Sequence, residues 1–536
     1  FDDIFTKRIA EANEFYKQIS PEIHHKDSEH IRKAAFSGLL WNKQYYNYNI
    51  QQWLNGDKYQ PEPPQDRKQG RNSNWQNLKA DDIISMPDKW EYPWFAAWDL
   101  AFQTIAFAEI DLEFAKKQIM LLFTDNYYCS DGRLPAYEWK FNDINPPVQA
   151  MAVVEICKTE KRRTGKIDLN FLETMFPLLL KNYQWWVKRE DANHNNVFEG
   201  GFLGLDNISI FNRSEGIPQG GRLDQADGTA WMALFSLNML EISLILTERD
   251  LKYENDCINF FNQFELIANS LHKISAIWAD KNDLDNGFFY DVLHLPDHRK
   301  IPLKIRSIAG IIPMLAVSCI SNEALKNAPA FKKLLHSYEK KECKYQIIDK
   351  EEKSDKIILS LLTPQQLKAL LPVLFDENEM LAPGGIRSLS KFYEKGFSIN
   401  IDSINYSLNY SSAESPNSMY GGNSNWRGPV WMPLNYLIVN TLKSYYEYYD
   451  DSLKFTFDTK EINLKKAAEI LSGRLTSIFK LQKNGIRAFN GNEKTYQSPE
   501  FKDLVLFYEY FDGETSKGLG ASHQTGWTAL IALLLD

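Results

Sequence analysis

Acidic side chains flanked by glycine or aromatic residues are the first feature of this chain that suits chemistry. They are Asp99, Glu138, Asp206, Asp224, Asp227 and Glu509. Hydrolysis of a glycosidic bond needs two carboxyl groups: a protonated one for the leaving oxygen, and an ionised one that activates water or attacks carbon. Any one of these carboxylates alone is more often a helix cap or a surface charge. The residue types therefore allow acid–base chemistry without choosing a pair.

The aromatic content suggests what such carboxylates would act on. The chain contains 14 Trp, 26 Tyr and 32 Phe, which is 13% of its residues, and many of them adjoin Asn, Asp, Gly or Arg. An aromatic face with polar neighbours suits a sugar ring, although large cores also use many aromatic residues. Lys and Arg number 61 against 70 Asp and Glu, a net charge of −9. This charge disfavours nucleic acid and anionic membranes as partners, and no apolar run reaches the ~18 residues of a membrane span.

Cysteine and histidine offer little support for metal or disulfide chemistry. The five Cys are far apart, form no CxxC and are odd in number, which favours a reducing compartment and a cytoplasmic location. The chain begins at Phe1 without Met, so we expect a processed product, and a secreted or periplasmic location stays open. His294 and His298 have the i, i+4 spacing of a zinc pair, but Pro296 between them argues against a helix. A zinc enzyme such as an α-barrel lanthionine cyclase therefore lacks its main support.

Apolar periodicity predicts an all-α fold. Leu464, Ala467, Ala468, Leu471 and Leu475 form one stripe at helical spacing. Further helices are expected near 31–54, 94–108, 110–124, 146–159, 168–188, 229–246, 255–274, 363–373 and 430–448. Long loops rich in Gly, Asn, Ser, Trp and Pro separate them, at 55–93, 131–146, 191–228, 380–390, 401–429 and 508–526. This pattern is typical of a helical toroid whose site is assembled from loops at one end, with an α-solenoid as the alternative.

Six segments in order resemble glycoside hydrolase family 63, which includes processing α-glucosidases and mannosylglycerate hydrolases and is related to the family 37 trehalases. They are Met86 to Leu100 with its Trp-Phe-Ala-Ala-Trp-Asp, Leu134-Pro-Ala-Tyr-Glu-Trp139 with Asn145-Pro-Pro147, Glu199-Gly-Gly-Phe-Leu-Gly-Leu-Asp-Asn207, Gln225-Ala-Asp-Gly-Thr-Ala-Trp231, Asn425-Trp-Arg-Gly-Pro-Val-Trp431, and Tyr508-Glu-Tyr-Phe-Asp through Trp527.

The resemblance implies an (α/α)6 toroid, formed by residues 1–536 as a single catalytic domain with 55–93 as a long loop. The N-terminal β-rich domain that the family often carries is not found in this chain. The activity implied is that of an inverting, exo-acting, α-glucosidase-like hydrolase that releases a terminal sugar from an α-glucoside or oligosaccharide. Asp206 would be the general acid and Glu509 the general base, with Glu138 as the next candidate for the base.

The resemblance also implies a set of substrate-binding residues, in which Asp99 would grip hydroxyls of the cleaved ring. The set is Trp98, Asp99, Tyr137, Glu138, Trp139, Gln225, Asp227, Trp426, Arg427, Trp431 and Trp527. The partner expected is a carbohydrate substrate, and no cofactor is required. Two alternatives remain: a non-catalytic carbohydrate-binding protein on the same toroid, and a polysaccharide lyase, whose usual basic cleft does not fit the net charge.

The segment before the Asp206 loop has the ligand alternation of a calcium loop. Oxygen ligands would come from the following residues: Asp191, Asn193, Asn195, the Val197 carbonyl and Glu199. Asn196 stands where an EF-hand has glycine, and asparagine tolerates left-handed backbone. The alternative is an Asx-rich turn without an ion. A bound ion here would hold the Asp206 loop in place.

If this loop holds calcium, EDTA should lower the melting temperature, because an ion that binds only the folded chain stabilises it by mass action. The measurement is a thermal melt with and without EDTA, followed by calcium add-back. A melting temperature that EDTA leaves unchanged would return the 191–199 segment to an ordinary turn.

Overall fold

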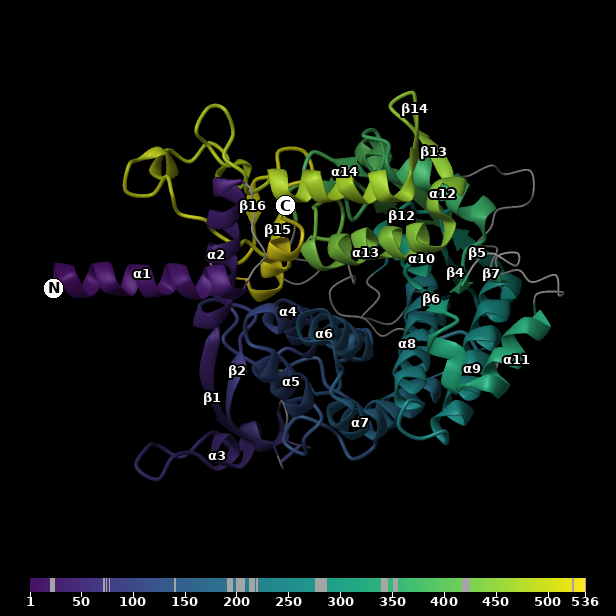
Figure 1. The fold of residues 1–536 in the computed structure, drawn as a ribbon, viewed down its shortest axis with the longest axis horizontal. Coiled ribbons are helices and arrows are strands. Elements are labelled where there is room, and N and C mark those ends of the chain that lie inside the picture. Colours follow the sequence, from purple (N-terminus) through teal and green to yellow (C-terminus); the bar gives the residue numbers. More distant parts are fainter. Residues whose placement is uncertain are drawn as a thin grey trace.

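A computed structural model gives the fold (Figure 1). The residues that it describes are 1–19, 25–70, 73, 75–76, 78–138, 141–189, 196–198, 208–211, 217, 220–274, 287–338, 346–349, 355–416, 425–522 and 525–535. Apart from the one expected over 31–54, the long helices predicted from apolar periodicity are confirmed, with small changes at their ends.

An inner set of helices forms a closed circuit of contacts. These are Ala97–Ile110 (α4), Gln149–Thr164 (α6), Ala226–Leu246 (α8), Ile312–Leu315 (α10), Met432–Tyr449 (α13) and the 3-10 helix Gly526–Leu533 (η9). Among the described residues each contacts the next in this order, and η9 contacts α4. The helix α8 is long and apolar enough to cross a membrane, with a mean hydropathy of 1.6, but 89% of that stretch is buried. It is apolar around its whole circumference because protein covers it on all sides.

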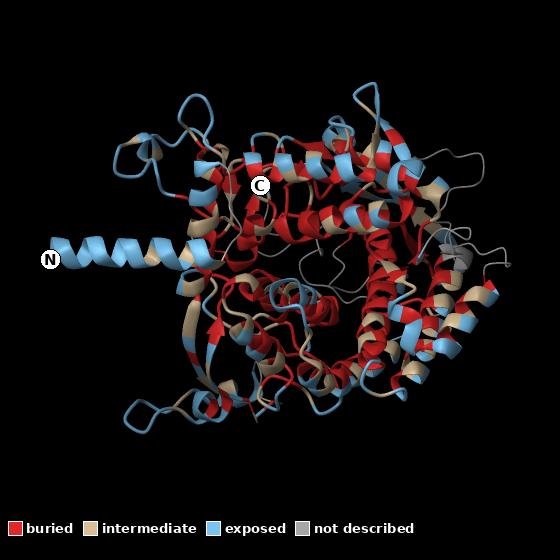
Figure 2. Cartoon of the chain, viewed as in Figure 1, coloured by how far each residue is buried: buried red, intermediate tan, exposed pale blue. Residues whose placement is uncertain are grey.

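A second set of helices lies outside the inner one. It comprises Lys26–Trp41 (α2), Leu112–Leu121 (α5), Leu169–Val187 (α7), Tyr253–Ile274 (α9), Pro329–Tyr338 (α11), Pro364–Leu374 (α12) and Leu464–Ser477 (α14). All of these except α11 and α12 pack against inner helices, whereas α11 contacts α9 and α12 contacts the strand Lys454–Phe457. The predicted stripe of α14 is buried against α13. Several of these helices begin at a side-chain cap, as at Asp168 before α7 and Thr363 before α12. Asp2–Ile19 (α1) has no buried residue and extends away from the body (Figures 1 and 2).

Short antiparallel sheets occupy the connections between helices, where the sequence had suggested loops alone. The paired strands are Lys43–Asn49 (β1) with Lys79–Ser85 (β2), Leu381–Ala382 (β9) with Gly385–Ile386 (β10), Phe397–Ile401 (β11) with Ile404–Leu408 (β12), Lys454–Phe457 (β13) with Lys460–Asn463 (β14), and Tyr510–Phe511 (β15) with Gly518–Leu519 (β16). Three-stranded sheets join Arg222–Asp224 (β3), Asp291–His294 (β4) and Lys300–Leu303 (β5), and likewise Val317–Ser321 (β6), Lys356–Ser360 (β8) and Gln346–Asp349 (β7).

The remaining elements are short helical turns. They are Ile50–Asn55 (α3), Gln65–Gln69 (η1), Ile308–Ile311 (η3), Ala324–Asn327 (η4), Lys391–Lys395 (η5), Asp450–Ser452 (η6), Ala488–Asn490 (η7) and Lys494–Gln497 (η8). With the strands, they correct two predictions. The helix expected over 31–54 ends at Trp41, and the loop expected over 55–93 contains η1 and β2.

The correction at 31–54 has a physical cause. Lys43–Asn49 is rich in Tyr, a residue that favours strands, and every one of its residues pairs with β2. On one face of this strand pair, Tyr46 and Ile84 are buried in a second hydrophobic cluster, separate from the main core. Long-range pairing with residues about forty positions away therefore overrides the local helical periodicity.

The inner helices α4 and α6 begin at the same end of the circuit. The Gln149 side-chain amide, at the first residue of α6, donates to the Ala97 carbonyl at 3.1 Å. The segment that leads into α13 lies beside the C-terminal chain, because Val430 pairs with Phe511. The C-terminal chain brings this segment to the same end. The loops that precede α4, α6 and α13 thus lie at one end of the fold.

A buried ion-pair cluster joins three helices and allows a stability test. The Lys116 ammonium of α5 lies 2.6 Å from Glu160 of α6 and 3.1 Å from Asp168, the cap of α7. Lys116→Met should lower the free energy of unfolding by about 3–5 kcal/mol, since it leaves the Glu160 carboxylate buried without its cation. Lys466→Met, which removes the exposed pair with Glu469, should cost under about 1 kcal/mol. Denaturant titrations of the two variants measure both, and equal effects would contradict the prediction.

Candidate active site

A tight turn before α4 presents the first acidic and aromatic groups. Asp88 is fully buried, and its Oδ1 accepts the backbone N–H groups of Trp90 at 2.8 Å and Glu91 at 3.0 Å. This turn brings Tyr92 back into a bridge with Asp88. The Tyr92 hydroxyl then lies 3.4 Å from Oε2 of Glu509, more than four hundred residues later.

Glu509, the predicted general base, lies in the C-terminal segment between Tyr508 and β15. Its side chain is 6% exposed, and its Oε2 also accepts the backbone N–H of Ala521 at 3.1 Å. The turn beyond β15 is anchored by Glu514, which bonds to Tyr410 at 2.6 Å and pairs with Arg387 at 3.1 Å. The carboxylate of Glu509 therefore stands on a hairpin that is fixed at both ends.

Asp99, in the first turn of α4, belongs to the same acidic group. Loss of solvation raises the pKa of Asp99 to about 8, with the negative charge of Glu509 as the second cause. Asp99 nevertheless keeps part of its surface accessible. Protein therefore surrounds this carboxyl on most sides while part of its surface stays accessible. The structure thus brings Asp99, Glu509 and Tyr92 together.

Glu138 reaches the same region from the loop before α6. Tyr137 bridges Ala96, and the Ala97 N–H donates to the Ala136 carbonyl, which places this loop beside the start of α4. Glu138 is 8% exposed, and desolvation raises its pKa to about 8, opposed by a hydrogen bond from the Phe95 backbone. It is therefore a second carboxyl that holds its proton near neutral pH.

Stacked aromatic rings form a wall behind Glu509. The ring centroids of Trp426 and Trp431 lie 4.0 Å apart and nearly parallel, and Tyr510 stacks on the other side of Trp431 at 4.5 Å. Trp527 meets Trp431 edge-on, and its indole N–H donates to the Glu509 carbonyl at 3.0 Å. Trp431 is only 1% exposed, so the structure gives it a supporting position rather than a surface for a sugar. Trp98 packs edge-on against the buried Trp231 of α8.

Arg427 connects this wall to the chain that follows Asp206. Its guanidinium donates to the Ser209 carbonyl at 2.7 Å, and its own N–H is held by the Asn425 side chain. Ile208, the residue before Ser209, belongs to the main core. Arg427 therefore bonds the residue three positions beyond Asp206, while Asp206 itself lies outside the described residues, as does Trp139.

The start of α8 holds the remaining predicted polar residues. Gln225 and Asp227 are 6% and 1% exposed, and the Ala226 N–H between them donates to Asp291 of strand β4 at 3.0 Å. The start of α8 is therefore anchored to the β3–β4–β5 sheet. His294, considered above as a zinc ligand, lies on strand β4 and approaches Asp224 at 2.7 Å. The doubt about a helix at Pro296 is thereby confirmed.

The candidate calcium loop falls largely beyond what the structure describes, which excludes Asp191, Asn193, Asn195 and Glu199. Asn196 has the expected left-handed backbone, with φ 56°. Val197 is buried, and the N–H of Phe198 donates to the Thr229 hydroxyl at 3.1 Å. Within the described ranges no cluster of three or more His, Cys, Asp or Glu side chains could hold a metal ion.

The sequence matches a known family of proteins. The profile described as "Mannosylglycerate hydrolase MGH1-like glycoside hydrolase domain" matches residues 92–202 and 357–528, together more than half of the chain. The chain belongs to this glycoside hydrolase family. The two matched ranges contain Tyr92, Asp99, Glu138 and Glu509, whereas Asp206 lies between them.

Solved structures agree with this assignment at the level of the fold. The mannosylglycerate hydrolase of glycoside hydrolase family 63 from Thermus thermophilus, in complex with Tris and D-glycerate, aligns with a TM-score of 0.52. The alignment covers 94% of this chain and 99% of that chain at 14% identity. The resemblance to family 63 is confirmed.

Curated relatives of this chain are longer proteins. An uncharacterized protein of Saccharomyces cerevisiae is 45% identical over 559 residues, covering 99% of this chain and 51% of that protein. The mannosyl-oligosaccharide glucosidase of the same yeast is 29% identical over 110 residues, 20% of this chain and 11% of that enzyme. The chain thus spans about half the length of the first relative and a smaller share of the second.

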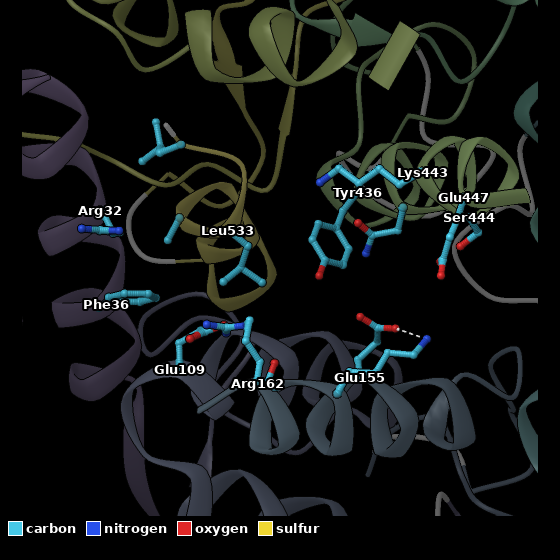
Figure 3. A pocket seen from close by; sticks show the side chains of 15 residues that line it. Arg32, Phe36, Glu109, Glu155, Arg162, Tyr436, Lys443, Ser444, Glu447 and Leu533 are labelled. Atoms are coloured by element: carbon cyan, nitrogen blue, oxygen red, sulfur yellow. Dashed lines mark hydrogen bonds and ion pairs between the residues drawn. The ribbon is translucent and has the colours of Figure 1, made fainter. Parts of the chain in front are cut away.

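A cavity of about 520 Å³ is lined by residues from α2, α4, α6, α13 and the C-terminal chain (Figure 3). It is lined by Glu109 in the last turn of α4, whereas Asp99 is in the first turn, about 15 Å along the helix. Four of its charged residues pair with one another: Arg162 with Glu109, and Lys158 with Glu155 at 3.1 Å. It therefore belongs to the opposite end of the inner helices.

The sequence reasoning missed two features of the site. Tyr92 was part of a quoted segment but was not named as a site residue, because nothing local to it shows the contact with Glu509. The sequence does not show the role of Ala521, because its backbone N–H, not its side chain, bonds the Glu509 carboxylate.

The Asp99 environment makes stability depend on pH in a defined direction. Its pKa is raised by folding, so the folded chain binds the proton more tightly, and stability falls as pH rises from about 4 to about 8. Asp99→Asn removes this loss. Its gain in stability over the wild type should grow from pH 5 to pH 8 and level off above that, at on the order of 5 kcal/mol, because each unit of pKa shift is about 1.4 kcal/mol.

Melting temperatures across pH measure this gain. The control is Asp458→Asn, at the exposed turn between β13 and β14, which should show no pH-dependent gain. A gain for Asp99→Asn that is the same at pH 5 and pH 9 would show that Asp99 is not desolvated.

Proposed function

We propose that this chain is the catalytic domain of an inverting glycoside hydrolase that releases a terminal sugar from an α-glucoside or oligosaccharide. The (α/α)6 toroid expected for the family is supported by the closed circuit of inner helices. The observation that carries the proposal is the convergence of Glu509, Asp99 and Tyr92 at the end where inner helices begin. The family membership and the names of the glucosidase relatives support the substrate class.

In this proposal Glu509 is the general base. An ionised carboxylate there accepts a proton from a water molecule as the water attacks the anomeric carbon. Asp206 acts as the general acid and protonates the leaving oxygen from the opposite face. Inversion needs the two carboxyl groups about 6.5–9.5 Å apart, which leaves room for the water between them.

Asp99 and Glu138 suit a different task. Each has a pKa of about 8, so each holds a proton at neutral pH and can donate a hydrogen bond to a sugar hydroxyl. A neutral carboxyl also adds no charge beside the base. Trp98 and Tyr137, which keep part of their surface accessible, supply apolar surface for the ring, while the buried Trp426 and Trp527 support it from behind. Arg427 steadies the chain after Asp206.

A calcium ion in the 191–199 loop would add a further support for the acid. The Asn196 backbone fits such a loop, and Phe198 ties its end to Thr229 of α8. The ion would supply no chemistry of its own in this proposal. It would hold the segment that leads to Asp206.

The roles of the two carboxylates can be separated by leaving-group quality. Asp206→Asn should lose proton delivery, so substrates with poor leaving groups should slow by on the order of 10²–10⁴-fold, while glycosyl fluorides retain more turnover. Glu509→Gln should slow all substrates alike, because attack by water is common to all of them. Initial rates on a graded series of aryl and natural α-glucosides and α-mannosides, with NMR of the product anomer, measure both effects.

The matched control is Glu493→Gln, an exposed glutamate that pairs with Lys517 beside the same hairpin, and it should leave rates unchanged. Near-normal activity in Glu509→Gln would move the base elsewhere, with Glu138 next. Binding of sugars without any turnover by the wild type would instead favour a carbohydrate-binding protein.

A further inference from the structure

The hairpin that carries Glu509 contains one residue more on its return strand than on its outgoing strand. Tyr510 pairs with Leu519, and Phe511 with Gly518. The next hydrogen bond runs from the Glu509 N–H to the Ala521 carbonyl at 3.0 Å. Gly520 is therefore the extra residue, and its backbone is left-handed, with φ +70°. A single extra glycine in this conformation is the arrangement of a β-bulge.

The bulge changes the destination of one backbone N–H group. In an ordinary antiparallel ladder, residues that exchange hydrogen bonds do so through both of their backbone groups. Here the Ala521 N–H donates instead to the Glu509 carboxylate at 3.1 Å. The Glu509 carbonyl, which would have received it, accepts the Trp527 indole N–H at 3.0 Å. The ladder bond is thus redirected to the side chain that the proposed mechanism uses as its base.

Glycine is also the only residue type that leaves room for this contact at position 520. A Cβ at position 520 would lie 2.3 Å from the Glu509 Oε2 and 2.9 Å from its Cβ. Real Cβ atoms do not approach so closely, so any other residue would displace the carboxylate or the turn. Two separate requirements, the left-handed backbone and the close approach, therefore meet at one glycine.

We propose that the bulge at Gly520 is a positioning device for Glu509: it redirects the Ala521 N–H to the carboxylate and, with Trp527, keeps that bond from reverting to the backbone ladder. The inference rests on the proposed function, in which Glu509 is the base. Gly520 and Ala521 act through Glu509 and touch no substrate. Bulges often re-aim a side chain beside an active site, and here the bulge aims a donor at the side chain.

The redirected bond has a predictable effect on the charge state of Glu509. The groups that face it are Asp99 and Tyr92 from the α4 side, Tyr510 from its own strand and the Ala521 N–H. The negative charge of Asp99, once it ionises, opposes ionisation of Glu509. A hydrogen bond from a backbone N–H favours the ionised form. Loss of that bond should therefore raise the pKa of Glu509.

The test compares two glycines with the same backbone conformation. Gly520→Ala should raise the titration midpoint of the Glu509 carboxyl by about one pH unit and lower kcat about tenfold, the effect of one hydrogen bond to a charged group. Gly485→Ala is the control: φ is +78° there, and an added Cβ meets nothing within 4 Å. It carries the same backbone strain and should leave both quantities unchanged.

The midpoint is read from the ¹³C carboxyl resonance of Glu509, identified by its loss in Glu509→Gln. The acidic limb of the kcat/KM profile should move with it. If Gly520→Ala folds poorly, Trp527→Phe gives a second measurement. This change frees the Glu509 carbonyl to accept the Ala521 N–H, and the midpoint of Glu509 should rise by a smaller amount.

An unchanged midpoint in the folded variants overturns the inference. Undiminished activity in Glu509→Gln overturns the proposed function alone, since the carboxyl titration does not depend on turnover.

Discussion

The packing of the last helix against the first inner helix is the constraint on which the site depends. The helix η9 contacts both α4 and α13 and so closes the circuit of inner helices. The contact is close: the Gly526 N–H donates to the Pro87 carbonyl, and a Cβ on Gly526 would lie 2.2 Å from the Gln103 side-chain nitrogen. Gln103, fully buried, in turn donates to the Met86 carbonyl at 2.9 Å. This seam holds the turn that carries Tyr92 next to the segment that carries Glu509.

The same closure creates the electrostatic character of the site. Segments from both halves of the chain exclude water from the start of α4, and this loss of solvation is the first cause of the raised pKa of Asp99. Two further carboxyls lie close by, yet they differ in environment: Glu138 is desolvated, whereas Glu509 receives donors from Ala521 and Tyr92. Differences of this kind let neighbouring carboxyls hold different protonation states at one pH. A protonated donor and an ionised base can therefore coexist at this end of the fold.

Much of the helical architecture was predictable, and the reasons for the failures are physical. The helices α6, α7, α8, α9, α13 and α14 have apolar positions at helical spacing, and burial of those faces is local to each element. The strands β1 and β2 were missed because each is stabilised by a partner about forty residues away. The 3-10 helix η9 was missed because its apolar run has no distinctive period, and only its place between α4 and α13 gives it a helical form.

The sequence by itself determined the helical class, the family and the identity of the acidic candidates, because each depends on residue types and short spacings. It singled out Asp99, Glu138 and Glu509 through their Gly and aromatic neighbours. Only the tertiary structure decided which of them meet, since the distance between residues 99 and 509 is set by ring closure and not by any local pattern. It also decided that Trp431 supports the wall from within and that a backbone N–H, freed by the Gly520 bulge, bonds the proposed base. Residue identity does not specify where a backbone N–H group points, so its direction appears only when the chain is folded.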